Sequence, residues 1–132
     1  MCAGVPRGPV VSLGASMGAF SSADIDLPPQ RAKALVDAGE AALVDVREPY
    51  EHDAGRIAGA CHIELERLAG KADSIDRDRP VIFHCRLGAR SAMAAQAFRA
   101  AGYEAYSLDG GIQAWVDDGL PIEPEGGYVA DH

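Results

Sequence analysis

The clearest candidate for covalent chemistry in the chain is Cys85, which follows a short apolar run and starts a Cys-Arg-x-Gly-x-Arg-Ser pattern. We expect the apolar run to form a strand that ends at Cys85, followed by a tight loop at Gly88 and then a helix. The first turn of a helix leaves backbone N–H groups without partners and carries the positive end of the helix dipole. The pattern therefore predicts a reactive thiolate or an anion-binding loop.

Three neighbours of Cys85 fit that chemistry. Arg86 and Arg90 are close enough in sequence to add positive charge, which favours the thiolate over the thiol. Gly88 lacks a Cβ atom and permits positive φ, so the loop can curl with its amides pointing inward. Together these residues predict an activated nucleophile above an anion-binding bowl.

The cysteines have two other interpretations. A single cysteine is most often a small buried hydrophobe, which is the prediction for Cys61 inside its own apolar strand. A zinc site would need the pairs Cys61-His62 and His84-Cys85 to converge. Adjacent residues on a strand point to opposite faces, which disfavours zinc, so His84 is predicted to be a packed strand residue.

Short apolar runs alternate with stretches of helical periodicity, which predicts βαβ units and a mainly parallel sheet. Strands are expected near Ile25 and at 42–45, 61–63, 81–83 and 105–108. Helices are expected at 28–37, 49–54, 64–68, 91–101 and 112–118, with Ser91 as a candidate N-cap. Ligands of such sheets bind at the carboxyl ends of the strands, where Cys85 and Asp45 both lie.

The bulk properties limit the classes of function. The 132 residues suit one domain, and a net charge of −8 argues against nucleic-acid binding. No apolar run is long enough to span a membrane. The three cysteines are too few, and odd in number, for a disulfide framework, which favours a reducing, cytoplasmic location.

The two ends of the chain differ from its middle in composition. Residues 1–23 contain one charged residue and many glycines and prolines, which predicts a disordered extension rather than a signal peptide. Residues 24–123 are predicted to form the domain. Residues 124–132, with Pro124, Gly126 and Gly127, are predicted to be a loose tail.

Four stretches, in order and at suitable spacing, resemble the rhodanese family of sulfurtransferases in its single-domain form. The resemblance covers about residues 24 to 123. The first signature, Leu-Val-Asp-Val-Arg-Glu-Pro-Tyr-Glu, occupies 43–51, and the second occupies 55–60, where a His and a Pro are more usual than Arg56 and Ala58. The cysteine pattern at 85–91 resembles the active-site loop, and 108–121 resembles the C-terminal signature.

The resemblance implies a rhodanese-like fold, that is, a doubly wound α/β domain with a mainly parallel five-stranded sheet and helices on both faces. It also implies a persulfide on Cys85, formed from a small anionic sulfur donor such as thiosulfate and discharged to cyanide, a thiol or a thiol-bearing protein. No metal or organic cofactor, nucleic acid or membrane is expected. The substrate-binding residues implied are Arg86, Leu87, Gly88, Ala89, Arg90 and Ser91.

Asp45 and Arg47 lie on the first signature and have two interpretations. Charged residues at strand ends often only brace a loop, so a structural ion-pair cluster, with Arg47 bound to Glu51, is favoured over direct catalysis. Trp115 is likewise predicted to be a core aromatic residue rather than a pocket wall.

Two further functions stay open. The cysteine pattern is also similar to that of cysteine-dependent phosphatases and arsenate reductases, whose loops are one residue longer. A phosphoryl group is larger than one sulfur atom, so the shorter loop favours sulfur. The other alternative is a non-catalytic rhodanese-like binding module, against which the retained Cys85 argues.

Overall fold

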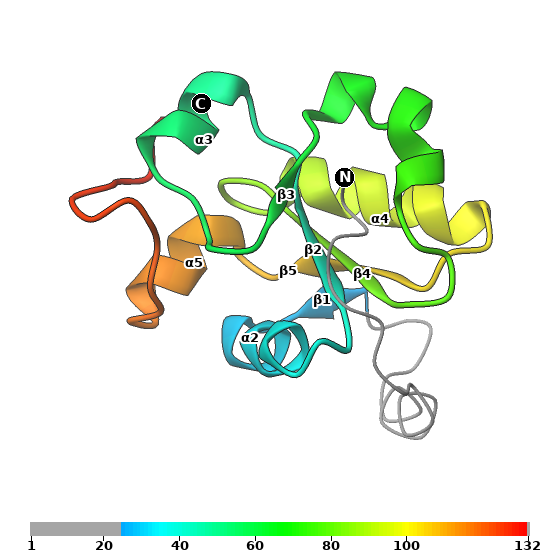
Figure 1. The fold of residues 1–132 in the computed structure, drawn as a ribbon, viewed down its shortest axis with the longest axis horizontal. Helices are drawn as coiled ribbons and strands as arrows, with labels where there is room; N and C mark the ends of the chain where they lie inside the picture. Colours follow the sequence, from blue (N-terminus) through cyan, green and yellow to red (C-terminus); the bar gives the residue numbers. More distant parts are fainter. Residues whose placement is uncertain (1–24, 132) are drawn as a thin grey trace.

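The structure is a computed structural model that describes residues 25–131, so the predicted N-terminal extension lies outside the described residues. Five parallel strands form one sheet in the order β1-β5-β4-β2-β3 (Figure 1). Their bounds are β1 Asp26–Leu27, β2 Ala42–Asp45, β3 Cys61–His62, β4 Val81–His84 and β5 Ala105–Leu108. The predicted parallel α/β sheet is confirmed.

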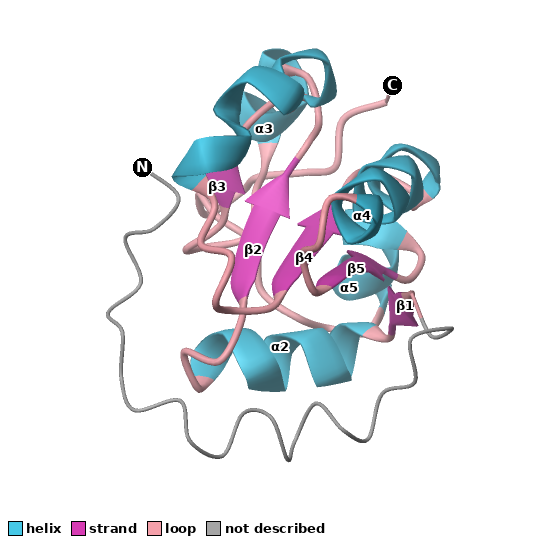
Figure 2. Ribbon diagram, turned by 90° about the vertical axis from the view of Figure 1, so that its right-hand side faces the viewer, coloured by secondary structure: helices cyan, strands magenta, loops and turns pink. Residues whose placement is uncertain are grey.

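Helices cover both faces of the sheet, as the doubly wound fold requires (Figure 2). α4 (Ala89–Ala100) packs on one face, through Phe98 against Phe83. α2 (Pro29–Asp37) and α5 (Gly111–Asp117) pack on the other, around Leu35 and Trp115, which is buried as predicted. Alternate strand residues feed the two cores, so every central strand is buried on both sides.

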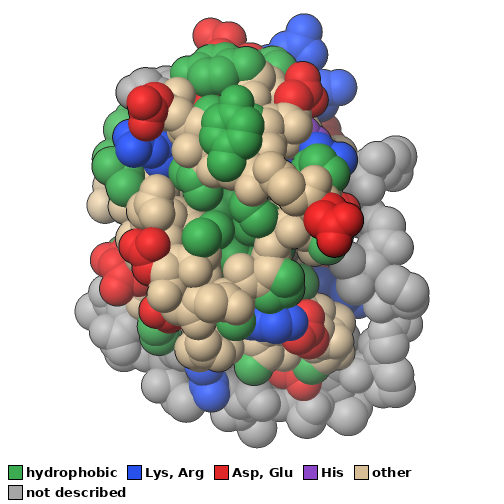
Figure 3. All heavy atoms as spheres, turned by 90° about the vertical axis from the view of Figure 1, so that its left-hand side faces the viewer, with side chains coloured by type: hydrophobic (Ala, Val, Ile, Leu, Met, Phe, Trp, Pro, Cys, Tyr) green, Lys and Arg blue, Asp and Glu red, His purple; other side chains and the backbone are tan. Residues whose placement is uncertain are grey.

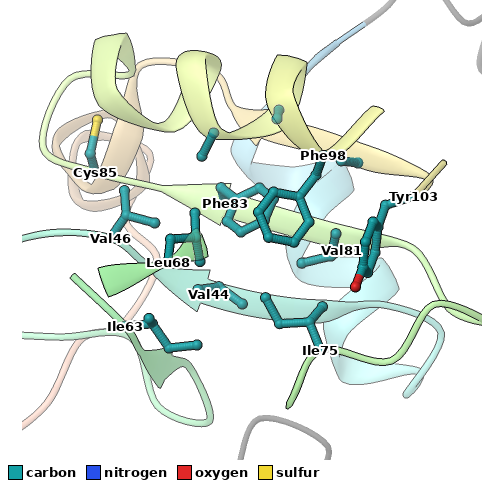
Figure 4. Close-up of a cluster of buried hydrophobic side chains, with 13 residues drawn as sticks. Val44, Val46, Ile63, Leu68, Ile75, Val81, Phe83, Cys85, Phe98 and Tyr103 are labelled. Carbon is teal, nitrogen blue, oxygen red and sulfur yellow. The ribbon is translucent and has the colours of Figure 1, made fainter. Parts of the chain in front are cut away.

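The core on the α4 face ends at the carboxyl edge of the sheet with Cys85 (Figure 4). In the middle of this core the Phe98 ring meets Tyr103 edge to face, with centroids 4.7 Å apart, and lies tilted against Phe83 at 4.9 Å. The sulfur of Cys85 is directed toward the start of α4. The hydrophobic core therefore fixes the position of Cys85 from behind and leaves its sulfur at the edge.

Three local predictions differ from the structure. α4 starts at Ala89 with Gly88 as its N-cap, so Ser91 lies inside the first turn and is not the cap. Gly88 has φ +116°, and this left-handed conformation lets the chain enter the helix earlier than a serine cap would. The predicted helix 64–68 is a 3₁₀ turn, η1 (Leu65–Arg67), and a second one, η2 (Ala69–Ser74), follows it.

Residues 120–131, here called the return segment, run back from α5 to α3 (Pro49–Ala54) (Figure 1). Arg56 and Glu123 form an antiparallel bridge, and the Tyr128 N–H donates to the Ala54 carbonyl at 3.0 Å. Composition predicted a loose tail from 124, but the tail backbone packs closely on Gly55, where a Cβ would lie 2.4 Å from the Tyr128 oxygen. Contact between backbones leaves no signature in side-chain composition.

The face made by α3, α5 and the return segment has hydrophobic side chains in its middle and charged ones around them (Figure 3). Tyr128, on the return segment, is among the exposed large side chains of the protein. Across residues 25–131, every helix is too short or too polar to cross a lipid bilayer.

Candidate active site

The loop between β4 and α4, residues 85–91, is here called the cysteine loop. Cys85 is a free, buried cysteine, and its Sγ accepts a hydrogen bond from the Gly88 N–H at 3.0 Å. A pocket of about 310 Å³ opens over the loop and is lined by Cys85, Arg86, Leu87, Ala89 and Arg90. The predicted loop residues therefore lie around one sulfur atom, which accepts from the N-cap residue of α4 and faces the start of that helix.

Ser91 completes the surroundings of the sulfur from inside the first turn of α4. Its Oγ lies 3.6 Å from Cys85 Sγ and 3.2 Å from the Gly88 carbonyl, to which it donates. The Ser107 hydroxyl, on neighbouring β5, lies 2.7 Å from the same oxygen. This pair of buried hydroxyls links the sulfur to the middle of the sheet.

The start of α5 holds the cysteine loop by its backbone. The Ile112 N–H donates to the Cys85 carbonyl at 2.9 Å, and the Gln113 N–H donates to the Arg86 carbonyl at 3.1 Å. Gly111 makes this approach possible: a Cβ there would lie 2.4 Å from the Arg86 oxygen, and φ is +65°. No other residue fits this position without moving the loop.

Arg90 is fixed by a carboxylate from another element. Its two terminal nitrogens donate to the two oxygens of Glu51, on α3, at 2.9 and 3.1 Å. Burial alone would lower the pKa of Arg90, but the hydrogen bonds and charge of Glu51 outweigh burial and raise it. Glu51 also accepts from the Glu48 N–H, so a fully buried carboxylate ties α3 to the cysteine loop.

Arg86, which lines the pocket, reaches the return segment. Its Nη2 lies 3.1 Å from Oδ1 of Asp131, on the return segment. Tyr50 donates from its hydroxyl to the Asp131 carbonyl oxygen at 3.1 Å. α3 and the return segment thus both contact arginines of the cysteine loop, through Glu51 and Asp131.

Asp45 and Arg47 form a closed pair behind the site. Arg47 donates from Nε and Nη2 to the Asp45 carboxylate at 2.7–3.1 Å, and from Nη2 to the Gly55 carbonyl at 2.7 Å. Both side chains are fully buried and do not line the pocket. The predicted Arg47–Glu51 pair is wrong in its partner, because the carboxylate two residues before Arg47 is within reach and Glu51 is taken by Arg90.

The electrostatics of this pair extend to a histidine. Although burial by itself raises the pKa of Asp45, the charge of His84 and the hydrogen bonds and charge of Arg47 lower it to about 2. His84 is fully buried on β4, with Nε2 3.8 Å from Asp45 Oδ2. Burial lowers the pKa of His84 against the attraction of Asp45, which fits its predicted place as a packed strand residue.

The residues considered for zinc do not converge. Cys61 and Cys85 belong to the core on the α4 face, while His84 faces Asp45 and His62 binds the Arg47 carbonyl. Cys61, predicted to be a buried hydrophobe, is half-buried and packs against the edge of that core. Among the described residues three carboxylates also approach one another, at Glu48, Glu64 and Glu66, but such acidic groups are common on surfaces.

The sequence did not single out Ser107 and Asp131, and it did not predict that Glu51 binds Arg90. Ser107 and Asp131 come from segments whose patterns indicate only a strand and a tail. Glu51 lies three residues after Glu48, a spacing that indicates a helix start, and its bond to Arg90 depends on a contact across 39 residues.

A family described as the rhodanese-like domain matches residues 28–118. A protein named sulfurtransferase from Allochromatium vinosum is 39% identical over 94 residues, which cover 70% of this chain and 88% of that protein. An uncharacterized protein of Bacillus subtilis is 43% identical over 77 residues, covering 58% of this chain. The match spans 61% of that Bacillus protein's length.

Solved structures share the fold. A rhodanese-related protein from Thermoplasma volcanium superposes with a TM-score of 0.70 at 28% identity, over 74% of this chain and 96% of that one. A protein from Rhodopseudomonas palustris, described as of unknown function and a possible tyrosine phosphatase, gives a TM-score of 0.66 at 28% identity. That match covers 91% of this chain and all of the other.

Proposed function

This chain belongs to the rhodanese-like domain family, and from that premise we propose that it is a sulfurtransferase that carries sulfane sulfur as a persulfide on Cys85. The relative named sulfurtransferase supports transfer of sulfur as the reaction. The observation that carries the proposal is the position of Cys85 Sγ, which accepts from the Gly88 N–H beneath a pocket lined by two arginines.

The first half-reaction loads the cysteine. The Cys85 thiolate attacks the outer sulfur of thiosulfate, the S–S bond of the donor breaks with its electron pair, and sulfite leaves. The product is a persulfide anion whose negative charge has moved one atom further from the protein backbone. N–H groups at the start of α4 and the Gly88 N–H are positioned to stabilise that charge.

The second half-reaction unloads it. Cyanide attacks the outer sulfur of the persulfide, thiocyanate leaves, and the thiolate of Cys85 returns. A thiol acceptor reacts in the same way and becomes a persulfide. No redox cofactor is needed, because the electron pair of each broken S–S bond stays with the leaving group or the thiolate.

The pocket and the loop fit a small reactant. A volume of about 310 Å³ lies at the lower end of ligand pockets, which span roughly 300–1,000 Å³. Arg86 and Arg90 line it and favour an anionic donor, while exposed Leu87 offers an apolar contact to an organic one.

Intact mass spectrometry tests the proposal without choosing an acceptor. After thiosulfate treatment we expect a mass gain of one sulfur atom that peptide mapping assigns to Cys85 and that cyanide removes with release of thiocyanate. The Cys85→Ser variant should show neither. A wild-type protein that is folded and never gains this sulfur would overturn the proposal.

Phosphate-ester hydrolysis is the second candidate, because one similar structure is described as a possible tyrosine phosphatase. Only four residues separate Cys85 from Arg90, and Gly111 packs against the loop from behind, which leaves little room for it to widen around a phosphoryl group. We expect no hydrolysis of an aryl phosphate beyond the Cys85→Ser background. Hydrolysis without sulfur transfer would make the protein a phosphatase and refute the proposed sulfurtransferase activity.

A further inference from the structure

Arg86 lines the pocket, and its guanidinium has one donor in an ion pair and another that is unpartnered in the described part of the chain. Arg86 binds Asp131 through Nη2 alone, and its buried Nε has no hydrogen-bond partner among the described residues. Arg47 shows how a guanidinium binds with two donors, since its Nε and Nη2 donate to the two oxygens of one carboxylate. Nε and Nη2 of Arg86 could bind two oxygens of an anion in the same way, but only after the ion pair between Nη2 and Asp131 breaks.

Asp131 is held in this position by the return segment. The Tyr128 N–H is bonded to α3, Val129 packs on the core around Trp115, and Ala130 is buried. The Asp131 carbonyl oxygen then accepts from Tyr50. The carboxylate itself is 95% exposed, so it is anchored through its backbone and is free to exchange Arg86 for water.

Asp131 also changes the net charge beside the pocket, through its ion pair with Arg86. The charge of Arg90 is balanced by buried Glu51, which leaves Arg86 as the other guanidinium that lines the pocket. Asp131 balances that one as well. Both arginines that line the pocket are therefore paired with carboxylates, and a dianion meets less positive potential than the sequence of the loop indicates.

We propose that Asp131 is a specificity-determining residue that competes with anionic donors for Arg86 and so disfavours dianionic sulfur donors relative to less charged ones. The proposal rests on the proposed sulfur transfer for its biological meaning. The favoured class is an organic persulfide. There the Cys85 thiolate attacks the terminal sulfur, the organic thiolate leaves with the electron pair of the S–S bond, and the persulfide proton stays with the transferred sulfur.

Alkylation of Cys85 tests the competition independently of sulfur transfer. Iodoacetate and iodoacetamide have nearly the same shape, and each loses iodide to the thiolate, but only iodoacetate is charged. The measurement is the ratio of their second-order rates at Cys85, taken by peptide mapping at low ionic strength. Asp131→Asn should raise this ratio about two- to fivefold, the range expected for an exposed ion pair.

A matched variant controls for net charge. Asp37→Asn removes another exposed carboxylate that is paired with a basic side chain, at the end of α2, close to where β2 begins, at the opposite edge of the sheet from Cys85. It should leave the ratio unchanged. An Asp131→Asn ratio equal to that of the wild type, or an equal rise in both variants, overturns the proposal.

A double variant tests whether Arg86 is the group in contention. In an Arg86→Gln background, Asp131→Asn should no longer change the ratio, because the competed donor pair is absent. A full effect in that background would mean that Asp131 acts through a general field, which contradicts competition for Arg86.

The thiosulfate half-reaction then connects the residue with the proposed function. Asp131→Asn should form the Cys85 persulfide two- to fivefold faster at low thiosulfate and at the same limiting rate when thiosulfate saturates. Absence of the persulfide in every variant would refute sulfur transfer and leave the alkylation result standing. A persulfide that forms equally fast in wild type and Asp131→Asn would refute the specificity role alone.

Discussion

Two loops at the same edge of the sheet use arginines in opposite ways. The loop after β2 closes Arg47 on Asp45 in a fully buried pair, with both side chains at 0% exposure. The loop after β4 leaves the sulfur of Cys85 and part of Arg86 facing a pocket. Both loops join a parallel strand to a helix, so topology alone does not make a site. What differs is where the arginine lies: Arg47 is fully buried against Asp45, although its Nη1 lacks a hydrogen-bond partner among the described residues, whereas Arg86 lines a pocket beside Cys85.

The largest expected loss of stability comes from breaking the buried Asp45–Arg47 pair in the loop after β2. Asp45→Asn leaves the buried Arg47 guanidinium without its counter-charge, and breaking such a pair costs about 3–5 kcal/mol of unfolding free energy. Chemical denaturation measures this loss. At a temperature where the variant is still folded, alkylation of Cys85 by iodoacetamide should keep the wild-type rate, since Asp45 does not line the pocket.

Asp37→Asn provides the exposed counterpart, because its ion pair with Lys33 is 2.6 Å long but open to solvent. It should cost at most about 0.5 kcal/mol. Two results would contradict the contrast between a structural loop after β2 and a reactive loop after β4. One is a similar loss of unfolding free energy in both variants, and the other is slower alkylation of Cys85 in folded Asp45→Asn.

The second largest expected loss of stability comes from adding a side chain where the start of α5 packs against the cysteine loop. Gly111→Ala places a Cβ against the carbonyls of Cys85 and Arg86 at a residue with φ +65°. We expect a loss of about 2–4 kcal/mol and, in the protein that remains folded, a slower alkylation of Cys85.

Gly119→Ala is the matched control for that variant. Gly119 has φ +81° and no atoms within 4 Å of an added Cβ, so the substitution carries only the conformational cost of about 1–2 kcal/mol. Its Cys85 should react as in the wild type. Equal reactivity in both glycine variants would show that the start of α5 does not shape the loop.

Acid should lower the unfolding free energy of the protein in two stages, through two buried groups behind the site. The pKa of His84 is lowered in the folded state, so the unfolded chain takes up protons first and stability falls as the pH drops below about 6.5. The pKa of Asp45 is about 2 when folded against 3.8, so about 2 kcal/mol more is lost as the pH falls from about 4 to 2.

Denaturation at a series of pH values measures both stages. His84→Gln should flatten the profile just below pH 6.5, although His52, whose pKa is lowered by burial and by neighbouring His62, retains part of the slope. A wild-type profile that is level from pH 7 to 5 would disprove the first stage.

The smallest effect concerns the hydroxyl pair beneath the sulfur. Ser107→Ala removes a buried contact of 2.7 Å to Ser91 and should cost about 1 kcal/mol. Ser91 keeps the Gly88 carbonyl as its acceptor, so we expect the rate of Cys85 alkylation to change less than in Gly111→Ala. A larger change would place Ser107 among the groups that set the reactivity of the sulfur.

Much of the fold was predictable because each strand is a short apolar run and each helix has its own periodicity. The same is true of the place of Cys85, since the end of a strand is visible in the sequence. The first residue of α4 was missed because a left-handed Gly88, rather than a polar side chain, starts that helix. Local patterns therefore predict elements better than the conformations that join them.

The partners of the charged residues were less predictable. Arg47 could reach Asp45 or Glu51, and the choice depends on Arg90, which is remote in sequence and brought to Glu51 by packing of α3. Asp131 lies in a segment whose composition indicates no structure, and it reaches Arg86 through backbone contacts to Ala54 and Gly55. Such pairings depend on the assembled fold, because the sequence offers each arginine several carboxylates and only the fold decides which one it contacts.

The bonds between the start of α5 and the cysteine loop also bear on how the protein is made. A ribosome builds the chain from its N-terminus, so Cys85 is synthesised before Ile112 and Gln113, whose N–H groups hold its loop. Until those residues emerge, the carbonyls of Cys85 and Arg86 lack their partners. A nascent chain therefore carries the cysteine without its finished pocket, and the reactive centre is completed only when nearly all of the matched domain has left the ribosome.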